Sequence, residues 1–253
     1  MRMAGLLEVC ADSVCSAVNA ARGGADRIEL CSALPLGGLS PDEDLFCMVR
    51  ERVDIPVRVL LRPRAGDFLY DEDEFELLCR QAARFAGLGA DGIVIGMLNP
   101  DGTLDAERMS ALMTCGDGCG VTLHRAFDVC RDAHEALRTA KKLGVDTILT
   151  SGQQARCADG APLLRELVSE GLRILIGGGV NADVIRALAP QTGADAFHLS
   201  AKAAVPSGME FRREAVPMGA AGLNEFELWR CDEGAVRAAR EALDAVCTAR
   251  KEN

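Results

Sequence analysis

Short apolar runs alternate along the chain with longer segments in which apolar residues recur at helical spacing. Two of the runs, LLEVCA and RIELCS, each contain a glutamate followed two positions later by a cysteine: Glu8 and Cys10, then Glu29 and Cys31. Residues two apart in a β-strand point to the same face. The pattern therefore predicts two strands that direct a carboxylate and a thiol to one side and their larger apolar side chains to the other.

Six further apolar runs follow, and each of the first seven leads into a segment with helical periodicity. The predicted strands are 6–11, 27–32, 56–64, 89–98, 120–128, 145–152, 172–179 and 194–201. Asp12 and Ser40 are the expected N-caps of the first two helices. A final helix is expected at 232–249, after an irregular segment at 202–228.

A Gly-Ala-Asp or Gly-Val-Asp sequence recurs between helix and strand, at 24–26, 89–91, 144–146 and 193–195. Recurrence at a similar point in each unit indicates a ring of strand–helix repeats. A doubly wound parallel sheet is the alternative, but the GxGxxG fingerprint is absent after the first strand and eight strands suit closure. We predict that residues 1–253 form one α/β domain, a (β/α)8 TIM-type barrel.

Composition narrows the partners that can be expected. A net charge of −10 without a basic run argues against nucleic acid or an anionic membrane as partner. No apolar run approaches the ~20 residues of a spanning helix. Eleven cysteines, with neither a secretion signal nor a Cys-X-X-Cys pair, predict reduced thiols in the cytoplasm rather than disulfides or structural zinc. Nothing indicates a nucleotide or organic cofactor.

Polar residues gather at the carboxyl ends of the predicted strands, where barrels of this type carry their chemistry. Glu8 and Glu29 on the first two strands, with His124 and Asp128 on the fifth, are candidates for moving a proton. The alternative is a satisfied layer of buried ion pairs. Because burying several charges without use is costly, we favour a polar pocket.

A second group of residues predicts a site for an anion. Three glycines separate the seventh strand from a helix N-terminus, where backbone N–H groups and the helix dipole favour negative charge. The same glycines could instead serve only a tight turn. None of the four lysines lies within a strand end, so Schiff-base chemistry is not expected. The residues expected to hold the anion are Arg62, Arg64, Ser151, Gly177, Gly178, Gly179 and Ser200.

The cysteine pair suggests a metal site. Cys10 and Cys31 are predicted on adjacent strands, which places them about 5 Å apart. Two thiolates at that separation suit a soft ion such as Cu(I) or a zinc ion. The eighth strand closes the ring beside the first, so His198 is a candidate third ligand. Alternatively, both cysteines only fill space, as buried cysteines often do.

Taken together, the stretches LLEVCADS, GGADRIELCS, RPRAGDFLY, VTLHRAFD, ILTSG and GGGV resemble the CutC family of copper homeostasis proteins. The similarity extends from about Leu6 through PSGMEFRR and PMGA, so it spans most of the chain. The resemblance implies a cytoplasmic barrel, a homo-oligomer such as a dimer or tetramer, and a link to copper. It also implies Cu(I) ligands at Cys10 and Cys31.

Two functional hypotheses follow, and a third is weaker. The first is a copper-binding protein that buffers or delivers Cu(I) at the barrel mouth. The second is an enzyme of lyase, isomerase or hydrolase type, acting on a small anionic substrate such as a phosphorylated compound or a carboxylate. The third is a non-catalytic scaffold that self-associates through 202–228, whose apolar anchors are Phe211, Met218, Leu223, Phe226 and Trp229.

Overall fold

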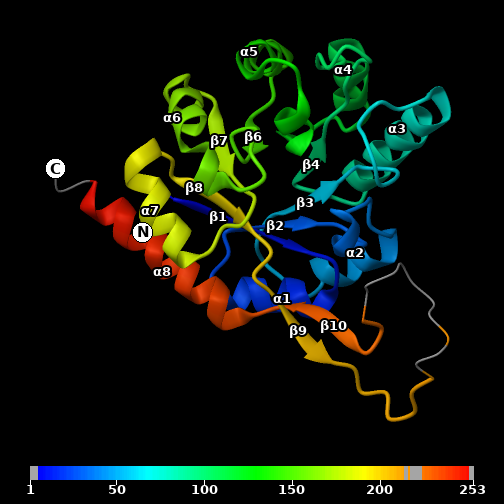
Figure 1. Cartoon of the computed structure of the whole chain (residues 1–253). Helices are drawn as coiled ribbons and strands as arrows, with labels where there is room; N and C mark the ends of the chain where they lie inside the picture. The colour runs from blue at the N-terminus through cyan, green and yellow to red at the C-terminus, as the bar shows by residue number, and fades with distance from the viewer. Residues whose placement is uncertain (1–4, 214–215, 217–223, 251–253) are drawn as a thin grey trace.

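A closed barrel of eight parallel strands forms the centre of the computed structural model, which describes residues 5–213, 216 and 224–250 (Figure 1). The strands pair in chain order and β8 closes onto β1, which confirms the predicted (β/α)8 fold. Their bounds are β1 (Leu6–Ala11), β2 (Arg27–Leu30), β3 (Val57–Leu60), β4 (Gly92–Ile95), β5 (Gly120–Leu123), β6 (Thr147–Thr150), β7 (Arg173–Ile176) and β8 (Ala196–Leu199).

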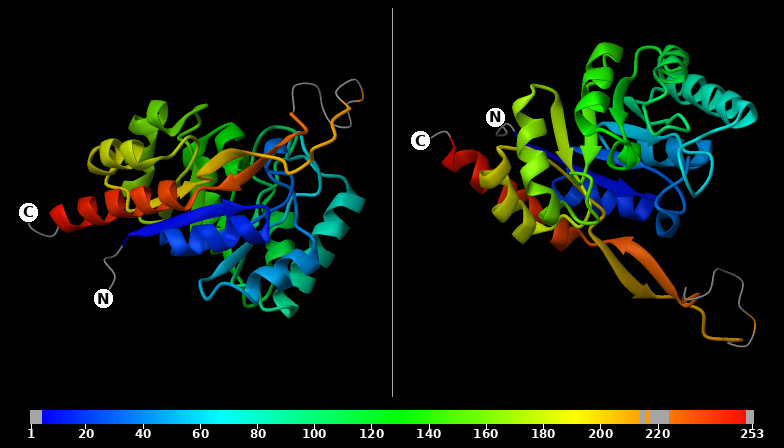
Figure 2. Two further views of the ribbon diagram at one scale, coloured as in Figure 1. Left: turned by 90° about the horizontal axis from the view of Figure 1, so that it is seen from below. Right: turned by 45° about the horizontal axis from the view of Figure 1, so that its top comes forward.

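Helices surround the barrel, one after each of the first seven strands and one near the carboxyl end of the chain. They are α1 (Val14–Gly23), α2 (Glu43–Arg50), α3 (Glu72–Gly87), α4 (Ala106–Cys115), α5 (Ala133–Leu143), α6 (Ala161–Ser169), α7 (Ala182–Thr192) and α8 (Glu233–Ala249). Three 3₁₀ turns lie in the loops: η1 (Leu34–Leu36), η2 (Arg125–Val129) and η3 (Cys157–Gly160). Helix α8 packs against α1 and α7 and so completes the outer ring (Figure 2). No helix in the described ranges is long and apolar enough to cross a membrane.

Both N-cap predictions are wrong by one or two residues. Ser13 caps α1, because it has the extended backbone that a cap requires and accepts a hydrogen bond from the Ser16 N–H. Asp42 caps α2 in the same way. The Ser40 hydroxyl instead joins the end of β3, since it accepts from the Arg62 N–H at 2.9 Å.

The recurrent glycine–aspartate sequence has a structural role that explains its position. Asp91 precedes β4 and accepts the Val57 N–H of β3 at 2.8 Å, and Asp146 precedes β6 and accepts the Val121 N–H of β5 at 2.7 Å. These carboxylates satisfy the first backbone donors of the neighbouring strands. The glycines lie in the left-handed region, at φ 98°, 85°, 81° and 79° for Gly24, Gly89, Gly144 and Gly193.

The strands alternate between a helix-facing surface and the barrel interior, as expected. Leu7, Val9 and Ile28 are fully buried in the main core under the helices. A separate apolar cluster of Cys31, Leu60 and Val94 and another of Leu149, Leu175 and Ala196 lie apart from that core. Val94 and Leu149 therefore face the barrel interior. This settles which residues of β4 and β6 point inward, which the sequence pattern left open.

The amino-terminal end of the barrel is closed by a charged group separate from the candidate site. Arg58 donates to Asp146 at 2.8 Å and to the Thr122 hydroxyl at 2.7 Å. Gly92 and Gly120 make room for it, because a Cβ on either would lie within 2.8 Å of the Arg58 side chain.

The prediction that 202–228 is irregular is wrong at both ends of the segment. Strands β9 (Lys202–Pro206) and β10 (Glu227–Cys231) pair antiparallel and form a ribbon that projects from the barrel (Figures 1 and 2). Trp229 and Phe211 are 37% and 66% exposed. Phe226 lies under the Arg212 guanidinium, with 4.6 Å from Arg212 Cζ to the ring centroid. Two other predicted anchors, Met218 and Leu223, lie outside the described residues.

Candidate functional site

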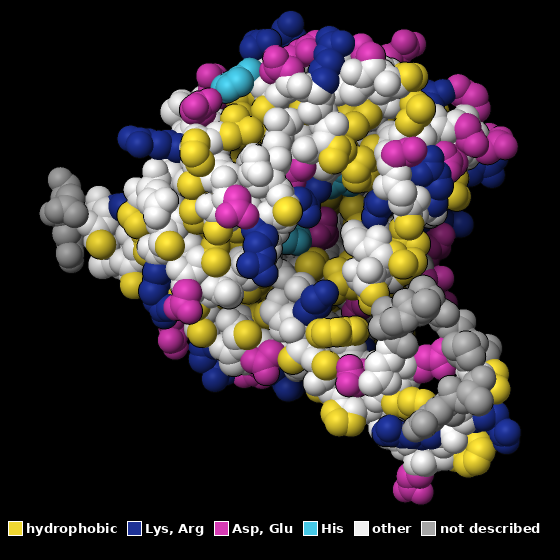
Figure 3. Space-filling view, in the orientation of Figure 1, with side chains coloured by type: hydrophobic (Ala, Val, Ile, Leu, Met, Phe, Trp, Pro, Cys, Tyr) yellow, Lys and Arg dark blue, Asp and Glu magenta, His cyan; other side chains and the backbone are white. Residues whose placement is uncertain are grey.

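A pocket of about 270 Å³ opens where the strands end, on the face seen in Figure 3, which is hollowed near its middle where histidine, acidic and basic side chains gather. Such a position at the carboxyl ends of the strands is where this fold carries its sites. The residues predicted from sequence that line it are Cys10, Glu29, Cys31, Arg62, His124, Gly178, Gly179, His198 and Ser200.

One group of potential metal ligands lies in this pocket. A sulfur of Cys10, a carboxylate oxygen of Glu29 and a ring nitrogen of His198 all lie within 4.8 Å of one another. The register explains the grouping, because β1 and β2 pair Cys10 with Glu29, while β1 and β8 pair Glu8 with His198. All three side chains are nearly inaccessible to solvent.

A second layer of charges orients the histidine. Its Nδ1 lies 2.8 Å from Glu8 Oε1, and its Nε2 lies 3.4 Å from Glu29 Oε2. The other Glu8 oxygen, Oε2, accepts from Arg27 Nε at 2.5 Å. A carboxylate that holds the far nitrogen of a histidine fixes the ring orientation, as behind many metal-bound histidines. Glu8 therefore supports the pocket from behind and does not line it.

The pKa values of these groups reflect burial and mutual charge. Burial alone would raise the pKa of Glu8, but the Arg27 charge and the His198 hydrogen bond outweigh it and lower that pKa to about 2. Burial raises the pKa of Glu29 to about 7, with the Glu8 charge adding to the rise and His198 opposing it. Burial disfavours a charged His198, yet the neighbouring Cys10, Glu29 and Glu8 groups raise its pKa well above the usual value.

Cys31 departs from the predicted metal site. Strands β1 and β2 are staggered so that Glu29, not Cys31, lies opposite Cys10, and Cys31 follows two residues further along. The register therefore does not place the two cysteines directly opposite each other, and Cys31 as a metal ligand stays a prediction. Cys31 still lines the pocket, but its thiol donates to the Ala11 carbonyl at 3.6 Å, and burial with the nearby Cys10 and Glu29 groups raises its pKa well above the ordinary value.

The other wall of the pocket carries Arg62, His124 and Phe68. Arg62 and His124 are 8% and 4% exposed. The Phe68 ring lies against both side chains, with its centroid 5.1 Å from Arg62 Cζ and 4.9 Å from the centre of the imidazole. Burial and the Arg62 charge lower the pKa of His124 to about 3, so its ring is neutral.

Arg64 is placed outside the pocket, contrary to prediction. Its guanidinium donates to Glu74 at 2.5 Å, to Asp67 at 3.0 Å and to the Leu69 carbonyl at 2.8 Å. These contacts hold the loop between β3 and α3, and the pKa of Arg64 is raised by hydrogen bonds to Asp67 and Glu74. The spacing of two from Arg62 indicated a shared face, but β3 ends at Leu60, so the alternation does not continue to Arg64.

Asp128 and Ser151 are anchoring residues rather than pocket residues. The Asp128 carboxylate accepts from the Thr150 and Ser151 hydroxyls, from backbone N–H groups of Ser151 and Gln153, and from Arg125 Nε at 2.7 Å. A carboxylate that accepts this many hydrogen bonds has few lone pairs free for a substrate. Gly177 is likewise behind the wall, where a Cβ would lie 2.6 Å from Leu149 Cδ1.

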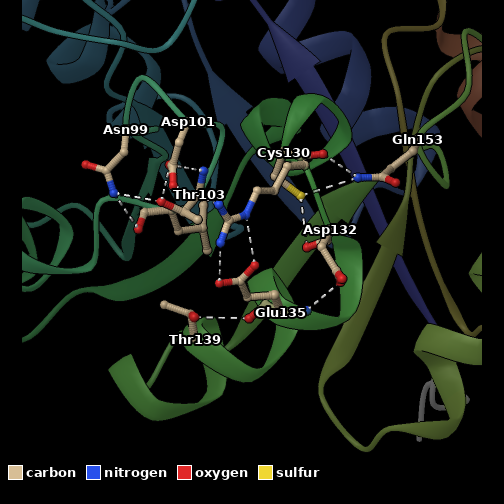
Figure 4. Close-up of polar contacts among 10 residues, drawn as sticks. Asn99, Asp101, Thr103, Cys130, Asp132, Glu135, Thr139 and Gln153 are labelled. Atoms are coloured by element: carbon tan, nitrogen blue, oxygen red, sulfur yellow. Dashed lines mark hydrogen bonds and ion pairs between the residues drawn. The ribbon is translucent and has the colours of Figure 1, made fainter.

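The loop after β6 is held from the outer side as well. Figure 4 shows the Gln153 amide reaching the carbonyl and sulfur of Cys130, at 3.0 and 3.3 Å. The guanidinium of Arg131 bridges Asp101 and Glu135. Gln153 takes a positive φ of 56°, which is uncommon without glycine and is stabilised here by these contacts.

Sequence reasoning missed Arg27, Phe68 and Lys202. Arg27 lies two residues before Glu29 on β2 and therefore points to the same side of the strand. The alternation that predicted Glu29 could also have predicted Arg27. Lys202 begins β9 directly after β8 and lines the pocket, although the lysines were expected to lie away from strand ends. Phe68 lies on a loop, where alternation gives no signal.

Two loops at the rim contain strained backbone. Ala33 and Ala201 have φ of 48° and 45°, in the left-handed region that residues with a Cβ rarely adopt. Each adjoins residues that line the pocket, Leu34 in one case and Ser200 with Lys202 in the other. Strain of this kind persists where the surroundings fix it and is concentrated at functional sites.

Fold and site together define a (β/α)8 barrel protein with a thiol, imidazole and carboxylate cluster at its mouth. The model of the CutC family matches residues 5–203, and the chain belongs to this family. It is 45% identical over 227 residues to a family protein CutC of Bacteroides fragilis, covering 88% of this chain and 90% of the relative. It is 44% identical over 237 residues to a copper homeostasis protein cutC homolog of Homo sapiens, covering 92% of this chain and 86% of the relative.

A solved structure agrees with this assignment. The crystal structure of CutC from Streptococcus agalactiae superposes with a TM-score of 0.73 at 26% identity, over 78% of this chain and 98% of that one. Thiamine phosphate pyrophosphorylase from Pyrococcus furiosus matches at a TM-score of 0.57 and 19% identity, over 95% and 96% of the two chains. The second likeness shows the barrel fold alone.

Proposed function

We propose that this chain binds Cu(I) in the barrel mouth and serves copper homeostasis in the cytoplasm, by buffering or delivering the ion. The observation that supports the proposal most directly is the ligand cluster of Cys10, Glu29 and His198, whose donor atoms lie within 4.8 Å of one another. Relatives named for copper homeostasis support it from a separate direction.

The donor set fits a soft or borderline ion. Thiolate sulfur selects Cu(I) and zinc, and imidazole nitrogen suits copper as well. The pair formed by Cys10 and His198 would hold Cu(I), with Glu29 beside it as a weaker oxygen donor. Glu8 stays on Nδ1 of His198 and leaves Nε2 to face the ion.

A titration of the reduced protein with Cu(I) against a competing chelator tests the proposal. Cys10→Ser and His198→Ala should each weaken binding at least about tenfold, since even supporting residues of metal sites carry effects of this size. Cys15→Ser, an exposed cysteine on α1, is the matched control and should bind as the parent does. Unchanged affinity in both Cys10→Ser and His198→Ala would rule out the site.

The Cys31→Ser variant separates two geometries. If the cluster of three residues holds the ion, this substitution changes affinity much less than Cys10→Ser. If instead the two thiolates share the ion, both substitutions cause the same loss, and the ligand set is Cys10 with Cys31.

A second function is favoured by the charge on the other wall. Arg62 lies buried in the pocket, and no carboxylate among the described residues forms an ion pair with it. We infer that the same mouth also takes a small anionic substrate, for enzymatic chemistry of lyase, isomerase or hydrolase type. A thermal-shift screen with phosphosugars and dicarboxylates tests this, and a protein that no anion stabilises would contradict it.

A further inference from the structure

Two neighbouring hydrogen-bond donors on the pocket wall have no acceptor within the described part of the chain. They are Nε of Arg62 and Nε2 of His124. The buried Tyr70 hydroxyl lies near Arg62 but outside the pocket lining, and it too makes no hydrogen bond of good geometry among the described residues. Both side chains line the pocket, and both are more than nine-tenths buried. Native proteins seldom leave buried donors without a partner, and such groups call for a specific explanation. The cost of each is about 1–3 kcal/mol, and more for a charged group.

The remaining nitrogens of Arg62 are already engaged, and only by neutral oxygens. Nη1 donates to the carbonyls of Leu36 and Gly38 at 3.2 and 3.1 Å, and Nη2 donates to the Gly66 carbonyl at 2.9 Å. These three bonds fix the plane of the guanidinium but leave its positive charge without a counter-charge. The group is therefore preorganised for an anion.

The orientation of His124 is fixed in a way that makes Nε2 the donor. Its Nδ1 accepts the Ala126 N–H at 3.1 Å, and Gly96 packs against the same edge of the ring. A neutral imidazole that accepts at Nδ1 carries its hydrogen on Nε2. The ring thus presents an N–H next to the Arg62 charge, with the Phe68 ring against both side chains.

Other charges around the pocket make this wall the positive side. Arg125 and Lys202 also line it, and Arg125 is paired with Asp128. Glu29 is the carboxylate among the lining residues, and it lies 3.4 Å from His198 at the metal cluster. An anion at Arg62 would therefore meet no unpaired negative charge of the described residues.

We infer that Arg62 and His124 form a carboxylate-binding subsite, in which Nε and Nε2 each donate to one oxygen of a small carboxylic acid. The inference deepens the second function proposed above. Two donors match the two oxygens of a carboxylate, whereas a phosphate group offers three oxygens and calls for more donors. The volume of about 270 Å³ lies below the range of roughly 300–1,000 Å³ typical of pockets for drug-sized molecules. The ligand is thus a small metabolite.

Histidine side-chain NMR of the full-length protein tests the subsite with defined probes: acetate, malonate and inorganic phosphate. The chain has three histidines, so His134→Gln and His124→Gln assign the ring signals. Malonate or acetate should shift the Nε2 resonance of His124 and leave that of His134, on the outer surface, in place. Arg62→Met should weaken malonate binding at least about tenfold, as expected for a hydrogen bond to a charged group.

Control variants make the outcome decisive. Arg80→Met removes an exposed arginine of α3 and should bind malonate as the parent does, because its guanidinium pairs with Glu76 outside the pocket. Cys10→Ser lacks the proposed copper ligand and should also retain malonate binding, so a failed copper site and a failed carboxylate site give different results. Arg62→Lys keeps the positive charge and is the second variant to use if Arg62→Met does not fold. It should bind malonate with intermediate affinity.

Three results would overturn the inference. The first is that neither carboxylate perturbs His124. The second is that phosphate perturbs it and the carboxylates do not. The third is that Arg62→Met, folded by circular dichroism, binds malonate with unchanged affinity. If other anions still stabilise the protein in that last case, the broader anion-binding function survives and only the assignment to Arg62 and His124 falls.

Discussion

Arg27 is the residue that allows a carboxylate to stay ionised beneath the pocket. Its Nε lies 2.5 Å from Glu8 Oε2, and the Glu8 side chain is fully buried. Breaking such a pair leaves an uncompensated buried charge, which costs about 3–5 kcal/mol. We therefore expect Arg27→Met to lower the free energy of unfolding by about this amount, measured by urea denaturation. Arg237→Met, which breaks the exposed Glu233–Arg237 pair on α8, should have a far smaller effect.

His124 should make stability depend on pH. Burial and the Arg62 charge lower its pKa to about 3, whereas a histidine in an unfolded chain titrates near ~6.5. Between these values the unfolded state binds one more proton, so stability falls as pH falls, by about 1.4 kcal/mol per unit. Urea unfolding from pH 7 to pH 4 should show this slope reduced in His124→Gln. The same slope in parent and variant would contradict it.

A matched histidine provides the control for that experiment. His134 lies on α5 with its side chain 43% exposed, near Glu166. Because water solvates this ring in both states, His134→Gln should alter the profile much less than His124→Gln.

At the scale of elements, the stagger between strands decides which groups meet. Alternation along β1 and β2 correctly predicted which residues face inward, since Leu7, Val9 and Ile28 lie under helices. Alternation carries no information on how far one strand slides past the next. The pairing of Cys10 with Glu29 therefore could not be predicted from sequence, and the expected separation of about 5 Å between Cys10 and Cys31 took no account of this stagger.

Loop residues set a second limit on prediction from sequence. Arg64 and Asp128 have the residue types of a functional site, yet their hydrogen bonds stabilise loops. Phe68 contacts both Arg62 and His124, but it lies in a loop, where the sequence has no periodic pattern from which these contacts could be predicted. The barrel itself could be predicted because its repeats are local, with glycine ending a helix and aspartate binding the start of the adjacent strand.

The residue after β4 must be glycine for His124 to occupy its place. A Cβ on Gly96 would lie 2.6 Å from Cε1 and Nδ1 of His124 and 2.9 Å from the Ala126 Cβ. We expect Gly96→Ala to destabilise the protein by about 1–3 kcal/mol through overpacking. It should also weaken the binding of any ligand to the pocket wall formed by Arg62 and His124. Gly87→Ala is the control, since a Cβ there meets nothing within 4 Å, and it should raise stability by up to about 1 kcal/mol. Thermal and urea unfolding measure both.

On the scale of the whole molecule, the ribbon of β9 and β10 is the part that departs from a compact barrel (Figure 2). Beyond β9 the chain exposes Met209 and Phe211, at 58% and 66%. Apolar groups exposed together often mark an interface. We expect the protein to be an oligomer by light scattering, and Met209→Ser with Phe211→Ser to shift it toward the mass of one chain. Val129→Ser, equally exposed on η2, should leave the mass unchanged, and a monomeric parent would refute the expectation.

The ribbon also gives the molecule a built-in optical probe. Trp229 is the single tryptophan, and its ring centroid lies 5.0 Å from the Lys202 ammonium, which itself lines the pocket. Its fluorescence therefore comes from one place beside the mouth, without background from the core. A ligand that enters the mouth and moves Lys202 away from the ring should therefore change this emission, so one unlabelled spectrum reports binding in the pocket.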